Sequence, residues 1–113
     1  MSDRGQAAEA LAADYLRQHG LSILERNFRC RFGEIDLIAR DGDAVVFVEV
    51  RMRGRSDFGG AAESITAAKR ERLRKAAGLY LSQQRTTPRC RFDAVLVSGA
   101  DGRIEWIRDA FGN

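Results

Sequence analysis

The chain has 113 residues, of which 44% are hydrophobic and 31% are charged, and its formal net charge is +3. This length allows one compact domain over residues 1–113 and is too short for two, and the composition excludes the disordered class. No apolar stretch approaches the ~20 residues that cross a bilayer, and the N-terminus lacks the pattern of a signal peptide. We therefore expect a cytoplasmic protein without membrane contact.

The first predicted element is a helix over residues 6–18. Its apolar side chains recur at helical spacing, and Gly20 follows as a terminator. Glu9 lies at the edge of the apolar arc when the segment is projected at ~100° per residue. A carboxylate that faces a core needs a partner or a function. The alternative is a first-turn glutamate that the helix dipole favours, with its head group in water.

Three strands are predicted next, at residues 21–28, 34–39 and 44–51. The turn over residues 40–43 (Arg-Asp-Gly-Asp) is short, so the second and third strands should form an antiparallel hairpin. Valine and phenylalanine on both faces of the 44–51 strand indicate a central strand that is covered on both sides. A charge inside this strand, such as Glu49, is therefore costly unless it is paired or has a function.

A second helix is predicted from Thr66 as its N-cap to about Gln84, followed by strands at residues 92–97 and 104–107. Because a helix links the 44–51 and 92–97 strands, these two strands should be parallel. The sequence therefore predicts an α/β fold of the α+β kind, in which a central mixed sheet is flanked by helices.

Two acidic side chains should meet on the hairpin. Alternation along the 34–39 strand places Glu34 and Asp36 on one face. Ile35 and Leu37 then take the other face. Same-face side chains on paired strands are ~5 Å apart when they are directly opposed, so Asp36 and Glu49 can converge on one point. Two carboxylates that close repel each other unless a proton or a cation lies between them.

Mg²⁺ or Mn²⁺ is the expected cation. Such hard cations bind carboxylates, carbonyls, waters and phosphate oxygens, and we assign the metal site to Asp36, Glu49 and the backbone carbonyl of Val50. Arg51 should point to the same place, where its permanent charge could hold a phosphate but could not act as a base. The alternative is structural: cross-strand salt bridges of Glu49 and Arg51, with Asp36 as the cap of a turn.

The segments 33–38 (Gly-Glu-Ile-Asp-Leu-Ile) and 47–50 (Phe-Val-Glu-Val) together resemble the YraN family of small bacterial proteins, which are predicted relatives of PD-(D/E)XK nucleases and Holliday junction resolvases. The likeness extends over almost the whole chain and includes Glu9, the pair Phe58-Gly59 and Lys69. It implies a restriction-endonuclease-like fold with an αβββαβ core.

The resemblance also implies roles for single residues. Asp36 and Glu49 would be metal ligands, and Glu9 would be a supporting carboxylate. The family pattern has a lysine two residues after the glutamate, whereas this chain has Arg51. Arginine could stabilise charge there but could not activate water. Arg51 in place of lysine should therefore leave metal binding intact but could lower the rate of cleavage.

Positive side chains follow the acidic motif, and the leading hypothesis is a metal-dependent endonuclease that acts on DNA. No element has the pattern of a base-specific reader, which favours structure-selective binding. One alternative is a non-catalytic nucleic-acid-binding module of the same fold, another is a protein-interaction adaptor, and a homodimer stays open. Six residues are expected to bind phosphates, although solvated faces would give the same charge pattern: Arg51, Arg53, Arg55, Lys69, Arg70 and Arg72.

Overall fold

The computed structural model describes residues 3–53, 65–99 and 101–112. Within these ranges the chain forms an α+β fold, a mixed sheet with flanking helices, as the sequence predicts, and this arrangement is compatible with a restriction-endonuclease-like core. The elements are α1 (Asp3–Gln18), β1 (Ser22–Cys30), β2 (Gly33–Asp41), β3 (Ala44–Arg53), α3 (Ala67–Ser82), β4 (Arg89–Ser98) and β5 (Ile104–Ile107).

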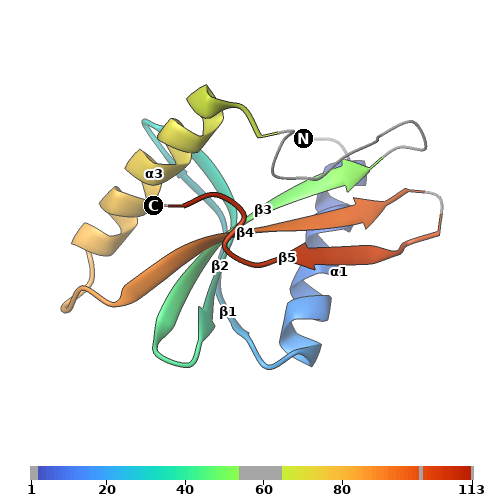
Figure 1. The fold of residues 1–113 in the computed structure, drawn as a ribbon, viewed down its shortest axis with the longest axis horizontal. Helices are drawn as coiled ribbons and strands as arrows, with labels where there is room; N and C mark the ends of the chain where they lie inside the picture. The colour runs from blue at the N-terminus through green and yellow to red at the C-terminus, as the bar shows by residue number, and fades with distance from the viewer. Residues whose placement is uncertain (1–2, 54–64, 100, 113) are drawn as a thin grey trace.

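The strands form one sheet in the order β1-β2-β3-β4-β5 (Figure 1). Strands β3 and β4 are parallel and the other neighbours are antiparallel, so the pairings predicted for the hairpin and for the strands linked by the second helix are confirmed. The hairpin turn is tighter than predicted, because only Gly42 and Asp43 lie between β2 and β3. Gly42 has φ of 62°, a conformation that glycine adopts without strain.

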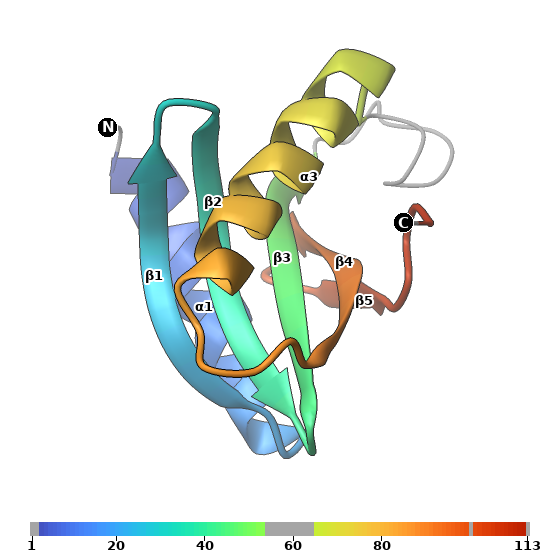
Figure 2. The ribbon, with the colours of Figure 1, turned by 90° about the vertical axis from the view of Figure 1, so that its left-hand side faces the viewer.

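Helices α1 and α3 cover opposite faces of the sheet, with α3 in front of the strands and α1 behind them in Figure 2. Leu73 and Tyr80 of α3 belong to the same core as Phe47, whereas Leu16 of α1 shares a core with Val48. Strand β3 thus contributes to both cores, as predicted for a central strand. Each fully buried side chain of this kind contributes roughly 1.5–3 kcal/mol of burial energy. Neither of the described helices is long and apolar enough to cross a bilayer.

The regular alternation predicted for the second strand is wrong at one point. Ile35, which pairs with Phe28 of β1, lies in the core on the α3 side of the sheet, whereas Leu37 lies in the core on the α1 side. Residues two apart normally share a face of a sheet, so the regular alternation of side chains is broken at Asp36. By the register of the ladder, Asn27 of β1 lies across from Asp36, and its φ is 55°. In both strands the alternation of side chains between the two faces of the sheet is therefore interrupted at the same level. As a result, Asp36 does not have to lie among apolar side chains only.

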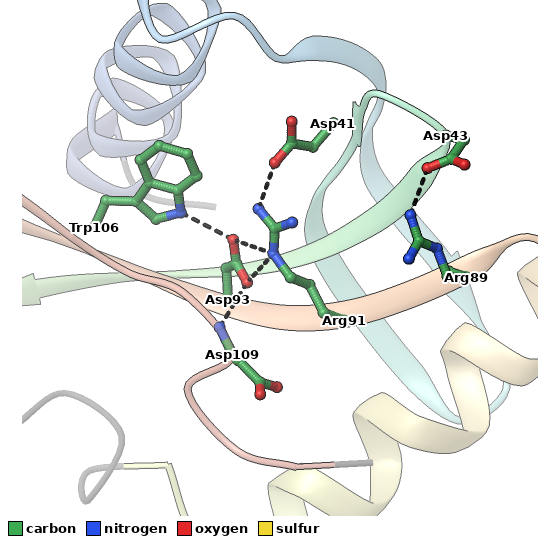
Figure 3. Close-up of polar contacts among 7 residues, drawn as sticks. All are labelled: Asp41, Asp43, Arg89, Arg91, Asp93, Trp106 and Asp109. Atoms are coloured by element: carbon green, nitrogen blue, oxygen red, sulfur yellow. Dashed lines mark hydrogen bonds and ion pairs between the residues drawn. The ribbon is translucent and has the colours of Figure 1, made fainter.

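A buried aspartate ties the C-terminal segment to β4 (Figure 3). The carboxylate of Asp93 is fully buried and accepts hydrogen bonds from Arg91 Nε at 3.0 Å, from Trp106 Nε1 at 2.9 Å and from the backbone N–H of Asp109 at 2.9 Å. Arg91 also forms an ion pair of 3.0 Å with Asp41. Because a buried carboxylate is tolerated only when it is well paired, this network favours one placement of β5 and the residues after it.

Candidate metal centre

Asp36 and Glu49, the two carboxylates predicted to converge, lie next to each other. The β2–β3 ladder ends at the pair Leu37–Val48, and Asp36 and Glu49 are the next residues on the two strands. Asp36 Oδ2 accepts a hydrogen bond of 2.8 Å from the backbone N–H of Val50, and the Asp36 carboxyl shares a hydrogen bond with Glu49. Burial and the neighbouring Glu49 raise the pKa of Asp36 to about 8. In the absence of a cation the pair therefore holds a proton at neutral pH.

A further carboxylate reaches this point from α1. Glu9 is only 7% exposed, so the alternative in which its head group lies in water is wrong. Burial and the charge of Asp36 raise the pKa of Glu9. Its Oε1 atom is buried and has no hydrogen-bond partner among the described residues. A buried carboxylate oxygen without a donor is unfavourable, which indicates a site for a positively charged ligand.

Glu34 completes the acidic cluster, although we did not predict it as a site residue. One oxygen from each of Glu9, Glu34 and Asp36 lies within 4.8 Å of the other two. Glu34 Oε2 also pairs with Arg29 Nε at 3.2 Å near the sheet edge. A signal for Glu34 was present in the sequence, because it lies two residues before Asp36 on the same strand, but the resemblance to the family assigned it no role.

The cluster opens into a cleft of about 360 Å³. Its acidic side offers only oxygen ligands, which hard divalent cations prefer, and the unpartnered Glu9 Oε1 supplies one ligand atom that no described donor competes for. The residues present therefore fit a Mg²⁺ or Mn²⁺ ion. The lining residues of the cleft are Glu9, Gly33, Glu34, Asp36, Lys69, Arg72 and Leu73.

Lys69 reaches the carboxylates from α3. The predicted N-cap is confirmed: Thr66 Oγ1 accepts a hydrogen bond of 3.2 Å from Lys69 N, which fixes the first turn of the helix. From this turn Lys69 Nζ lies 3.0 Å from Glu49 Oε2, and the Glu49 side chain is only 4% exposed. Arg72, three residues further along α3, lines the same cleft. An ammonium group thus lies beside Glu49, although Arg51 occupies the position where the family pattern has lysine.

Arg51 lies two residues beyond Glu49 on β3. Its register partner on β4 is Leu96, which belongs to the core on the α3 side, so Arg51 projects from the same face of the sheet as Glu49. Among the described residues it is not part of the cleft lining. Arg55 and the pair Phe58-Gly59, which we also singled out, lie outside the described residues.

Two other residues predicted to bind phosphates lie away from the acidic cluster. Arg53 forms an ion pair of 3.2 Å with Glu105 of β5. The guanidinium group of Arg70 lies over the ring of Phe111, 5.6 Å from its centroid. Of the six predicted phosphate-binding residues, the structure therefore brings Lys69 and Arg72 together with the carboxylates in one cleft.

A mixed sheet between α1 and α3, with acidic residues gathered where the regular β2–β3 ladder ends, is compatible with the restriction-endonuclease-like fold. The family model described as "Uncharacterised protein family UPF0102" matches residues 8–97. The chain belongs to this family, which is the YraN family, and the predicted resemblance is therefore confirmed.

Relatives of the same family resemble the chain over nearly their full length. A UPF0102 protein of Nitrosomonas europaea is 58% identical over 110 residues, which cover 96% of this chain and 93% of the relative. A UPF0102 protein of Methylobacillus flagellatus is 56% identical over 98% of both chains. A third, from Pseudomonas aeruginosa, is 50% identical over 96% of this chain and 92% of the relative.

Proposed function

We propose that the protein is a metal-dependent endonuclease that hydrolyses phosphodiester bonds in DNA and selects its substrate by structure. One observation carries the proposal: Glu9, Asp36 and Glu49 come from three different elements and converge beside a cleft that also holds Lys69 and Arg72. Acidic oxygens next to fixed cations suit a phosphate that is bound partly through a divalent cation.

Each residue of the acidic cluster and the cleft would have a separate role in the reaction. Asp36 and Glu49, with the backbone carbonyl of Val50, would hold Mg²⁺ or Mn²⁺, and Glu9 would support them. When bound, the cation lowers the pKa of a coordinated water and neutralises charge on the phosphate. The Val50 N–H orients the Asp36 carboxylate through its 2.8 Å hydrogen bond. Lys69 and Arg72 would bind phosphate oxygens at the same cleft.

The first test is cleavage of a panel of linear, flapped, single-stranded and four-way DNA with Mg²⁺ or Mn²⁺. The natural protein should cleave at least one of these substrates, and Glu49→Ala should reduce the rate by about 100-fold or more, because it removes a metal ligand. Glu25→Ala is the matched control, since Glu25 is exposed on β1 and does not line the cleft. Equal cleavage by the Glu49→Ala protein would contradict the proposal.

A non-catalytic nucleic-acid-binding module is the second candidate, and two observations favour it. Arg51 occupies the position of the family lysine, and a guanidinium group does not deprotonate in proteins. Lys69, the ammonium group nearby, is already paired with Glu49. Arg51→Lys separates the two candidates: cleavage that appears only in the lysine variant would identify the natural protein as a binder.

The partner and location belong to the same proposal. The net charge of +3 and the cationic side of the cleft suit a nucleic acid, which we take to be DNA. We expect the protein to meet it in the cytoplasm. If two strands are cut together, two chains would have to act as a homodimer, and sedimentation with and without four-way DNA would detect this.

A further inference from the structure

We propose that the first divalent cation binds to Glu9, Glu34 and Asp36, with Glu34 as a direct ligand, while Lys69 keeps Glu49 outside this ligand set. The inference rests on the proposed metal-dependent function and deepens it, because it moves the cation toward α1. It also adds a ligand that neither the sequence pattern nor the resemblance to the family assigned.

The spacing of the three carboxylates supports this site. Their nearest oxygens lie within 4.8 Å of one another. Oxygens on opposite sides of a Mg²⁺ ion are about 4.2 Å apart, and those around Ca²⁺ are about 5 Å apart. Three oxygens on one octahedral cation include neighbouring pairs that are only about 3 Å apart, so side-chain rotation has to bring these groups closer together than the 4.8 Å limit.

Glu9 supplies the independent evidence that something binds between these groups. Glu9 is only 7% exposed, and its Oε1 atom has no donor among the described residues. The carboxyl of Glu9 is held by a hydrogen bond from Asn27, the residue at which β1 changes phase. The same phase change places Glu34 within reach of Glu9. The irregularity of β1 at Asn27 and the unpartnered Glu9 Oε1 atom therefore lie at the same acidic cluster.

Glu34 and Glu49 each have a cation partner, but the Glu34–Arg29 pair is partly exposed to solvent, whereas the Glu49 side chain is only 4% exposed. Its Oε2 atom already has a cation at 3.0 Å in Lys69 Nζ, and Glu49 is not among the residues that line the cleft. A divalent cation that enters the cleft therefore meets Glu9, Glu34 and Asp36 first. Glu49 joins the ligands only when Lys69 leaves it, for example to bind a phosphate oxygen.

The test is calorimetric titration of the intact protein with MnCl₂ in the absence of nucleic acid. Glu34→Gln should weaken Mn²⁺ binding about 10-fold or more, because it removes a charged ligand. Glu49→Gln should change the dissociation constant by less than about threefold, because Glu49 does not line the cleft in which the cation binds. Glu25→Gln makes the same change of charge on an exposed part of β1 and should bind as the natural protein does.

Two results would overturn the inference. One is a natural protein that binds no Mn²⁺ at millimolar concentration. The other is unchanged binding in Glu34→Gln together with loss of binding in Glu49→Gln, which would return the cation to Asp36 and Glu49 and leave the nuclease proposal intact. Conversely, binding that depends on Glu34 in a protein that cleaves no DNA would support the inference and contradict the proposed enzyme.

Discussion

The Asp36 carboxyl group has polar neighbours on two sides, in β3 and in the acidic cluster. On one side it accepts the Val50 N–H and shares a hydrogen bond with Glu49, and on the other its oxygen lies within 4.8 Å of Glu9 and Glu34. The surrounding burial removes the water that would otherwise separate these charges. A proton or a cation is therefore required at this residue, and which of the two is present depends on pH and on metal concentration.

Without metal, this arrangement predicts a protein that becomes less stable as pH rises. The folded-state pKa of Asp36 is about 8, above its ordinary value of 3.8, because of burial and the neighbouring Glu49. The folded state therefore binds more protons than the unfolded state between these values, and the free energy of unfolding should fall from about pH 4 to pH 8 and then level off. One such group contributes at most about 1.4 kcal/mol per pH unit. Urea denaturation in EDTA at pH 5, 6, 7 and 8 measures the slope.

Asp36→Asn identifies the source of this slope. Asparagine keeps an acceptor for the Val50 N–H but cannot ionise, so the decline in stability with pH should become smaller. Asp43→Asn is the matched control, because Arg89 lowers the pKa of the exposed Asp43 and this group is ionised throughout the range. A slope in Asp36→Asn as steep as that of the natural protein would show that other groups cause it.

At the level of elements, local patterns predicted most of the fold. The Gly-containing turn predicted the β2–β3 hairpin, the intervening helix predicted parallel β3 and β4, and Thr66 marked the start of α3. These features depend on neighbours in the sequence, which is why they can be read from it. Alternation also placed Asp36 near Glu49.

The change of phase in β1 and β2 could not be predicted in this way. It depends on Asn27 adopting a positive φ opposite Asp36, and asparagine tolerates that conformation without requiring it. The position of Lys69 at Glu49 likewise follows from how α3 packs on the sheet. Both features arise from tertiary contacts, so the full acidic cluster, with Glu34 in it, required the structure.

The attachment of β5 to β4 gives a prediction about stability. Asp93→Asn leaves Arg91, Trp106 and the Asp109 N–H with a weaker and uncharged acceptor, and we expect a loss of roughly 2–4 kcal/mol in the free energy of unfolding. Urea denaturation followed by the fluorescence of Trp106, the single tryptophan, measures it.

A nearby exposed pair provides the comparison for Asp93→Asn. Asp43 and Arg89 form an ion pair of 2.9 Å in which both side chains are about 80% exposed (Figure 3). Asp43→Asn should leave the free energy of unfolding close to that of the natural protein, because solvent screens such pairs. Similar losses in the two variants would mean that burial does not distinguish them.

Over the whole molecule, the arrangement of charge matters more than the net charge of +3. The acidic cluster lies toward the start of β2, where the first two turns of α3 bring Lys69 and Arg72 to the cleft. The Asp43–Arg89 pair lies at the hairpin turn, toward the other end of the same strand. Under the proposed function, a bound phosphate backbone should contact this end of the sheet, where Lys69 and Arg72 lie beside the acidic cluster.

This polarity predicts how binding responds to salt. The affinity for labelled four-way DNA, with Ca²⁺ as the divalent cation, should fall linearly with salt on logarithmic axes, and Arg72→Gln should reduce the magnitude of the slope by about 0.9, the loss of one phosphate contact. Arg89→Gln removes the same charge at the other end of β2 and should leave the slope unchanged, because Arg89 is paired with Asp43 away from the cleft. Fluorescence anisotropy between 50 and 200 mM salt would measure both. Equal changes of slope in the two variants would mean that binding follows overall charge and does not use the cleft.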